Sequence, residues 1–214
     1  MQTTFARLLL KHAAERPQDA AMREKEYGIW QALTWAELAK MVEHLACGLH
    51  AAGLKRDDHM VVVGANRPRL YATMLAVQAL GAVPIPLYQD AAALECIFPI
   101  NNADVCFAFA EDQEQVDKLL EVREQCPQLT NIYFDDPRGL RKYDEPGLAS
   151  LETLLEAGKA FAAAHPAFFK TEVEKAKPTD VAAMFFTSGT TGNPKGVVHT
   201  HNSLLNAAES GAKF

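Results

Sequence analysis

The stretch HMVVVGANRPRLYATMLAVQALGAVPIPLY, residues 59–88, holds two short apolar runs on either side of a segment of helical length. The first run, HMVVVGA, is rich in β-branched residues and suits a strand that is buried on both faces. The middle segment has a proline near its start, where a helix tolerates proline. The second run, AVPIPLY, follows directly. Strand, helix and strand in this order predict a βαβ unit with a right-handed crossover.

The segment before this unit, TWAELAKMVEHLACGLHAAG at residues 34–53, predicts an amphipathic helix. Thr34 and Glu37 have the spacing of a capping box, and Gly53 stands where a left-handed terminating residue is expected. Apolar residues recur at spacings of three and four, so that one stripe should face a core. The stripe consists of Trp35, Leu38, Val42, Leu45, Leu49 and Ala52.

The alternation of helices and strands continues after residue 88. DAAALECIFPINNA is helical in pattern, and we expect Pro99 to end or kink it. DVCFAFA, the helical EDQEQVDKLLEVREQC and NIYF come next. The acidic excess of the helix over 111–125 is typical of a solvated face. Together these segments predict an α/β fold with an open, mainly parallel sheet and flanking helices.

We divide the chain into three parts. Residues 1–134 form an N-terminal α/β subdomain. Residues 135–180 are predicted to be a surface connecting region with a helix through LASLETLLEAGKAFAAAHP. Residues 181–214 contain a strand, VAAMFF, a tight connection, TSGTTGNPKG, a second strand, GVVH, and a helix that Asn202 or Ser203 should cap.

Composition limits the possible functions. The chain has 214 residues, of which 49% are apolar, enough for one or two domains with a real core. Its net charge of −6 and the absence of a basic stripe disfavour a nucleic-acid partner. No run approaches the roughly 20 apolar residues of a membrane span, and the N-terminus lacks a secretory signal. We therefore expect a cytoplasmic location and leave peripheral attachment to a membrane open.

The cysteines and histidines do not form a recognisable metal site. The four cysteines, at 47, 96, 106 and 126, are widely spaced and lack a C-x-x-C pair, so we expect reduced and mostly buried thiols. His199 and His201 would share one face of a strand, but no third ligand is evident. Loop packing explains this pair better than a metal, and we assign no residue to a metal site.

The connection TSGTTGNPKG has the residue types that bind a polyphosphate. Gly189, Gly192 and Gly196 permit positive φ and let successive N–H groups converge on an anion. The hydroxyls at 187, 188, 190 and 191 add donors, and Lys195 adds a mobile positive charge. A Walker A loop would need glycine at Pro194 and a hydroxyl residue at 196, so that motif is excluded. Ser188 lacks the G-x-S-x-G context of a hydrolase nucleophile.

FTSGTTGNPKGVVHTH closely resembles the signature phosphate loop of the AMP-binding, or adenylate-forming, enzymes. This superfamily contains acyl-CoA synthetases, luciferases and peptide-synthetase adenylation domains. Agreement with [ST]-S-G-T-T-G-x-P-K-G is continuous over residues 187–196. The region from GIWQALTW to IPLY is similar to the N-terminal part of the same enzymes, and REKEYGIWQALTW looks more like the long-chain fatty acyl-CoA synthetase branch. The resemblance covers residues from about 5 to about 206.

The resemblance implies an ATP-dependent acid–thiol ligase of fatty acid metabolism. A carboxylic acid, with a long-chain fatty acid favoured, would react with ATP and Mg²⁺ to give an acyl-adenylate, and coenzyme A would then displace AMP. These small molecules would be its partners. The residues implied to hold the β- and γ-phosphates are Thr187, Ser188, Gly189, Thr190, Thr191, Gly192 and Lys195.

The resemblance leaves several points open. His201 either lines the site or has an ordinary hydrogen-bonded or capping role, and no residue of this chain is assigned as catalytic. The family's later elements, including a metal-binding glutamate and a C-terminal lysine, would follow Phe214. We therefore expect a partial N-terminal domain that does not complete the reaction alone and that self-associates through exposed sheet edges. A non-catalytic nucleotide-binding or interaction module, and an adenylating enzyme that passes its acyl group to a carrier protein, remain alternatives.

Overall fold

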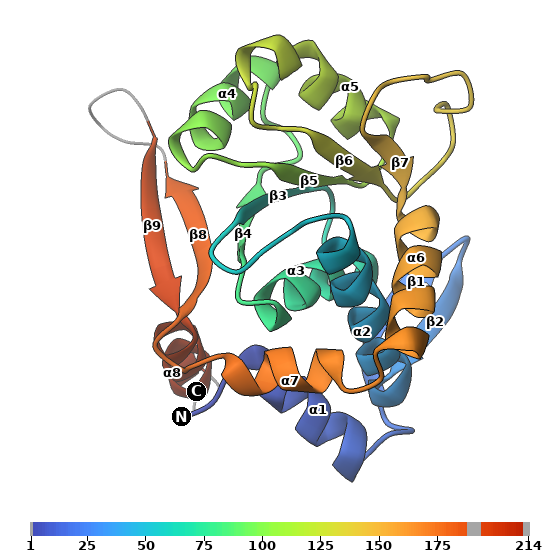
Figure 1. The fold of residues 1–214 in the computed structure, drawn as a ribbon, viewed down its shortest axis with the longest axis vertical. Coiled ribbons are helices and arrows are strands. Elements are labelled where there is room, and N and C mark those ends of the chain that lie inside the picture. Colours follow the sequence, from blue (N-terminus) through green and yellow to red (C-terminus); the bar gives the residue numbers. More distant parts are fainter. Residues whose placement is uncertain (1, 188–193, 212–214) are drawn as a thin grey trace.

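A computed structural model describes residues 2–187 and 194–211 of the chain. Its centre is a five-stranded sheet with the order β4-β3-β5-β6-β7, in which every pair of neighbours is parallel (Figure 1). The predicted open α/β sheet is thus confirmed. The strands are β3 (His59–Val63), β4 (Val83–Leu87), β5 (Phe107–Ala110), β6 (Asn131–Phe134) and β7 (Leu148–Ser150).

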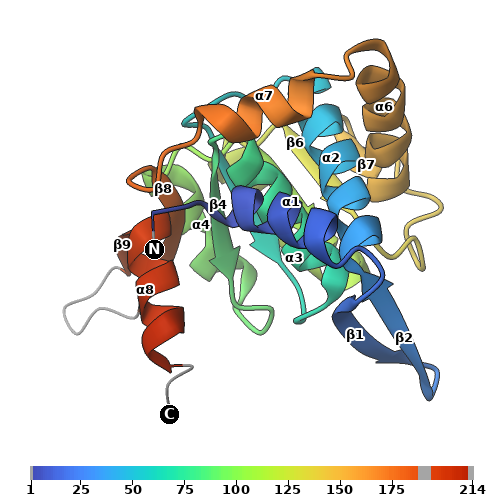
Figure 2. The ribbon, with the colours of Figure 1, turned by 90° about the horizontal axis from the view of Figure 1, so that it is seen from below.

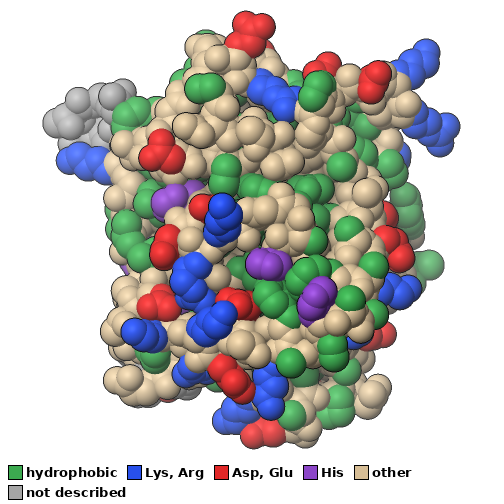
Figure 3. All heavy atoms as spheres, viewed as in Figure 1, with side chains coloured by type: hydrophobic (Ala, Val, Ile, Leu, Met, Phe, Trp, Pro, Cys, Tyr) green, Lys and Arg blue, Asp and Glu red, His purple; other side chains and the backbone are tan. Residues whose placement is uncertain are grey.

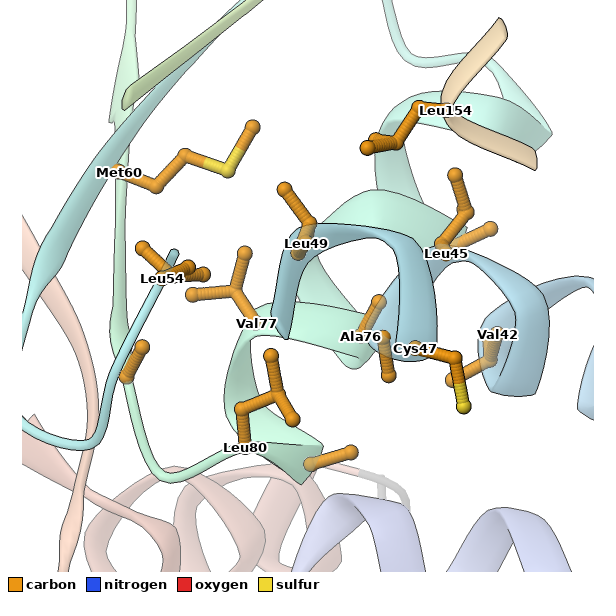
Figure 4. Packing of buried hydrophobic residues seen from close by; sticks show 14 of the residues in the cluster. Val42, Leu45, Cys47, Leu49, Leu54, Met60, Ala76, Val77, Leu80 and Leu154 are labelled. Atoms are coloured by element: carbon orange, nitrogen blue, oxygen red, sulfur yellow. The ribbon is translucent and has the colours of Figure 1, made fainter. Parts of the chain in front are cut away.

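Helices cover both faces of this sheet, which explains the uninterrupted apolar runs of its strands. Met60 and Val62 belong to the core on one face, whereas Val61 and Val63 belong to the core on the other. On the first face, side chains of α2, α3 and α6 pack in one cluster with Met60, as Figure 4 shows. The helices are α1 (Phe5–Glu15), α2 (Trp35–Ala51), α3 (Pro68–Ala79), α4 (Ala93–Asn102), α5 (Gln113–Glu121), α6 (Leu151–Ala164) and α7 (Phe168–Lys175).

Helix α2 is the helix that the sequence predicts over residues 34–53. Thr34 and Glu37 form a reciprocal capping box: the Thr34 N–H donates to Glu37 Oε2 at 2.8 Å, and the Glu37 N–H donates to Thr34 Oγ1 at 3.3 Å. Gly53 follows the helix with a φ of +106°. The predicted apolar stripe faces the core from Leu38 to Leu49, with Trp35 at its partly buried end. Ala52, the last residue of the predicted stripe, lies just beyond the helix and is exposed.

Pro99 does not end helix α4. The helix continues to Asn102, and the Pro99 ring is buried in its last turn. A proline at this position removes one intrahelical N–H donor, and only three further residues follow it in the helix. Helix α4 therefore continues through the proline with the loss of one hydrogen bond.

The segment 135–180 is more than a surface connection. It supplies β7 to the edge of the parallel sheet and two packed helices, α6 and α7. Leu151, Leu154, Phe169 and Val173 are buried in the core that also contains α2 and α3. The predicted helix through this segment is confirmed as α6. The boundaries at 134 and 180 remain a prediction.

The cysteines agree with the expectation of reduced, mostly buried thiols. All four are free, and Cys47, Cys96 and Cys126 are buried. Burial raises the pKa of the Cys47 thiol to about 11, so the thiol stays protonated near neutral pH. These side chains serve as small apolar residues of the core.

Charged side chains of both signs alternate on the face drawn in Figure 3, over its lower part, where α1 and α7 lie. Glu172 on α7 is paired with Lys175 at 2.6 Å and with Arg56 at 3.6 Å, and Arg56 also approaches Asp180 at 3.8 Å. Acidic side chains on this face are therefore paired with basic neighbours.

Candidate functional site: the phosphate-loop hairpin and the adjoining cavity

The predicted phosphate loop connects two antiparallel strands, β8 (Val181–Thr187) and β9 (Lys195–Thr200). Their register pairs Thr187 with Lys195, so a hydroxyl and an ammonium flank the loop. Directly opposed residues have Cβ atoms about 5 Å apart on the same face of the ribbon. Both side chains are exposed. The predicted phosphate-binding residues Ser188, Gly189, Thr190, Thr191 and Gly192 lie outside the described residues.

Gly196 has a different role from the one that the sequence suggests. We expected it to permit positive φ, but it lies in β9 and is absent from the glycines with positive φ among the described residues. A Cβ on Gly196 would lie 3.2 Å from Met184 Sδ and 3.4 Å from the Phe186 ring. Glycine at this position gives the side chains of β8 room to pack across the hairpin.

The hairpin lies beside β4 without joining the parallel sheet (Figure 1). Pro84 and Pro86 of β4 explain the gap in hydrogen bonding. Successive N–H groups of a strand point to opposite edges. The Val83 N–H points toward the β3 side and donates to Asp58 O at 2.9 Å, so residues 84 and 86 direct their backbone groups to the outer edge of β4. Both residues are proline, which has no N–H to donate there. The outer edge of β4 therefore cannot donate to β8 there, and side chains must hold the hairpin in place.

Gln78 provides one such attachment. Its side chain is buried on α3, and its Nε2 donates to the backbone oxygen of Ala182 in β8 at 2.7 Å. Phe186 adds an apolar attachment through its edge-on contact with Phe98 on α4, with ring centroids 6.2 Å apart. The hairpin is thereby fixed to helices on both faces of the sheet.

We expect Gln78→Leu to lower the free energy of unfolding by about 1–3 kcal/mol, because the Ala182 oxygen would lose its buried donor. Urea unfolding measures this change. Gln115→Leu is a matched control, because Gln115 is also a buried glutamine but its side chain accepts only a weak 3.5 Å bond from Lys118. Equal losses in both variants would contradict the assigned role of the Ala182 bond.

A cavity of about 680 Å³ opens at the carboxyl ends of β3 and β4, beside the end of β8. This is the edge at which open α/β sheets bind ligands. Thr187 lines the cavity and so joins it to the phosphate-loop hairpin. Sequence reasoning did not name the other lining residues, although their position just after two parallel strands could have indicated them. They are Val62, Gly64, Ala65, Asn66, Leu70, Pro86, Leu87, Tyr88, Gln89, Asp90, Phe185 and Phe186.

His201 lies at the opposite end of β9 from the loop. Six residues of extended strand separate it from the loop, a distance of about 20 Å. The His201 ring is buried, accepts a 3.4 Å hydrogen bond from the Phe5 N–H and packs on the Phe5 ring. This geometry favours the hydrogen-bonded role over the site-lining role. Helix α8 (His201–Gly211) is capped by Thr200, whose Oγ1 accepts from the Ser203 N–H at 3.2 Å, and not by Asn202 or Ser203.

Burial lowers the pKa of His201 to about 4, and the nearby Asp180 carboxylate opposes this effect only in part. The unfolded chain therefore binds this proton more readily than the folded protein does. We expect about 2–3 kcal/mol of stability, fully present above pH 6.5, to be lost as the pH falls from about 6.5 to about 4. Urea unfolding across this range measures the loss. His201→Gln keeps an acceptor for Phe5 and should flatten the dependence; an equally steep dependence in this variant would count against His201.

Comparison with known proteins identifies the family of the chain. The family model described as "AMP-binding enzyme" matches residues 9–213. The chain belongs to this family. Among curated relatives, the long-chain-fatty-acid–CoA ligase FadD15 of Mycobacterium tuberculosis is 27% identical over 200 residues, which cover 94% of this chain and 32% of the relative. The long-chain-fatty-acid–CoA ligase ACSBG2 of Xenopus laevis is 24% identical over 90% of this chain and 25% of its own length.

Two solved structures of CoA synthetases share the fold. Acetoacetyl-CoA synthetase from Streptomyces lividans matches 95% of this chain and 31% of its own, with a TM-score of 0.76 and 22% identity. A Mycobacterium tuberculosis fatty acyl CoA synthetase matches 98% of this chain and 37% of its own, with a TM-score of 0.71 and 21% identity. The chain spans about a quarter to a third of the length of the curated relatives it matches. In its described part, no helix is both long and apolar enough to cross a membrane.

Proposed function

We propose that this chain is the N-terminal portion of an ATP-dependent acyl-CoA synthetase. The enzyme would activate a carboxylic acid as an acyl-adenylate and transfer the acyl group to coenzyme A. A long-chain fatty acid is the favoured substrate, because the curated relatives are named as ligases of such acids. The observation that carries the proposal is the hairpin that presents Thr187 and Lys195 on either side of the phosphate-loop sequence, next to a cavity at the carboxyl edge of the sheet.

The reaction needs positioning and charge neutralisation more than covalent help from the protein. A carboxylate oxygen of the acid attacks the α-phosphorus of ATP, a new P–O bond forms, and the bond to pyrophosphate breaks. The coenzyme A thiol then attacks the acyl carbonyl, loses its proton, and AMP departs. Lys195 would neutralise negative charge on the β- and γ-phosphates, and the Thr187 hydroxyl would donate a hydrogen bond to them.

The described residues fit the phosphates of ATP better than they fit a metal ion. Lys195 makes no ion pair with another residue in the described part of the chain, so its charge is available to a ligand. No group of three or more His, Cys, Asp or Glu residues in the same part could hold a metal. Mg²⁺ would enter with ATP and shield its phosphate charge, while the donors of this chain orient the phosphates.

Acid-dependent exchange of pyrophosphate into ATP tests the first half-reaction. The full-length gene product should catalyse exchange with a subset of acids, and a series of increasing chain length identifies them. Residues 1–214 alone should show neither exchange nor thioester formation, because the proposal places the remaining catalytic groups elsewhere in a longer protein. Absence of exchange with every acid would favour a binding module, and thioester formation by 1–214 alone would overturn the fragment's proposed inactivity.

A further inference from the structure

Strands β1 (Ala20–Glu26) and β2 (Ile29–Thr34) form an antiparallel hairpin that the proposed activity does not use. Its two-residue turn consists of Tyr27 and Gly28. In Figure 2 the hairpin reaches out past the helices, so its turn is the part farthest from the core. Sequence analysis missed these strands because MREKE lacks the apolar alternation of a half-buried strand.

The two faces of the hairpin differ in character. Met22 and Leu33 share the inner face and pack against the core. The period-two alternation of a strand puts Arg23 and Lys25 on the outer face, where Lys25 pairs directly with Trp30. The Trp30 side chain is 67% exposed. The outer face therefore combines two cations with an exposed indole.

The carboxylates of the hairpin lie on its inner face. Glu24 and Glu26 line a cleft of about 550 Å³ between the hairpin and the sheet, and Glu24 is paired there with Arg67 at 3.3 Å. Arg23 and Lys25 form no ion pair with any other described residue. Positive charge on the outer face is consequently not neutralised by the hairpin's own acidic residues.

The turn carries a tyrosine where its backbone conformation favours a smaller residue. Tyr27 has a φ of +46° and Gly28 a φ of +81°, and a two-residue turn of this kind favours Asn or Gly at both positions. A bulky residue at positive φ is an outlier whose presence motivates a functional hypothesis. Tyr27 is 84% exposed, so its ring gains little from packing that could offset the strain.

We propose that the hairpin tip, defined as Arg23, Lys25, Tyr27, Ile29 and Trp30, binds the surface of a bilayer that contains anionic phospholipids. Trp and Tyr rings favour the boundary between headgroups and acyl chains, and cations beside them are attracted to anionic headgroups. Ile29, also largely exposed, adds apolar surface next to the turn. The proposal is independent of the proposed activity.

The size and shape of the tip favour a membrane over a protein partner. A stable protein interface needs about 800 Å² on each side, with complementary shape and packing. The five side chains stand on a narrow, projecting two-stranded ribbon and so do not form the broad, shape-complementary face of such an interface. A bilayer surface deforms around an inserted side chain and needs no matching pocket, so a small tip that carries both aromatic rings and cations suffices.

The test uses flotation of the chain with vesicles of phosphatidylcholine alone and of phosphatidylcholine mixed equally with phosphatidylserine. We expect binding to the mixed vesicles, weakened by salt. Arg23→Gln and Lys25→Gln should each reduce partition roughly fivefold, and Trp30→Gln roughly tenfold. Tyr27→Asn removes the ring but suits the turn, so this variant should fold at least as well as the parent while it binds less.

Matched controls lie elsewhere on the surface. Tyr88→Asn removes another exposed tyrosine, and Lys170→Gln removes another exposed cation. Both should float with the mixed vesicles as the parent does. Absence of binding by the parent, equal binding of the tip variants, or equal binding to vesicles without phosphatidylserine would each overturn the proposal. Far-ultraviolet circular dichroism of each variant confirms that a loss of flotation does not come from unfolding.

Discussion

Replacement of Lys195 by alanine in the full-length gene product should reduce acid-dependent ATP–pyrophosphate exchange by roughly 100- to 1000-fold, the loss typical of a deleted donor to developing negative charge. Lys195 is exposed at the end of β9, opposite Thr187. The cavity that Thr187 lines begins beside this pair. A mobile ammonium at that position can follow the phosphates as pyrophosphate departs, whereas alanine leaves their charge uncompensated.

Two variants separate this role from a general effect of charge. Lys195→Arg keeps the charge but changes its geometry, and should retain part of the exchange activity. Lys177→Ala removes an exposed lysine near the other end of β8 and should leave exchange unchanged. If Lys195→Ala exchanged at the parental rate, the assignment of this lysine to the phosphates would be wrong, while the fold and the family of the chain would stand.

The sequence predicts those strands and helices whose own residues are enough to define them, without contacts from distant segments. Val61, Val62 and Val63 are β-branched and buried on both faces, so a parallel strand follows from the run itself. The Thr34 and Glu37 capping box likewise marks the start of α2 within four residues. Local chemistry was enough in both cases.

The features that the sequence does not predict depend on contacts between distant segments. His201 is buried because the N-terminal segment, 196 residues earlier, covers it. The cavity beside Thr187 requires the ends of β3, β4 and β8 to meet at one edge, which only the strand order determines. The strands of the β1–β2 hairpin lack a regular alternation of apolar and polar residues, so apolar periodicity could not reveal them.

The packing of α6 on α2 could not be predicted from the sequence either, because it depends on two glycines, which have no side chain. A Cβ on Gly158 of α6 would overlap the His44 backbone oxygen of α2 and lie 2.7 Å from the Gly48 nitrogen. A Cβ on Gly48 would in turn overlap the Leu154 oxygen. Glycine on each helix thus allows the two backbones to touch. In a helical segment rich in alanine, the sequence does not show that this glycine lies at a helix–helix contact.

Gly158→Ala should therefore lower the free energy of unfolding by about 3 kcal/mol or more, at the upper end of overpacking effects, because backbone atoms cannot move aside as a side chain can. The added methyl group favours the helix by up to about 1 kcal/mol, which offsets only part of this loss. Urea unfolding measures the change. Gly211→Ala is the matched control, since a Cβ at this helical glycine meets nothing within 4 Å. The control should be as stable as the parent or slightly more stable. A Gly158→Ala protein of parental stability would mean that α6 does not press on α2, and segment 135–180 would then be the loose surface connection that its sequence suggests.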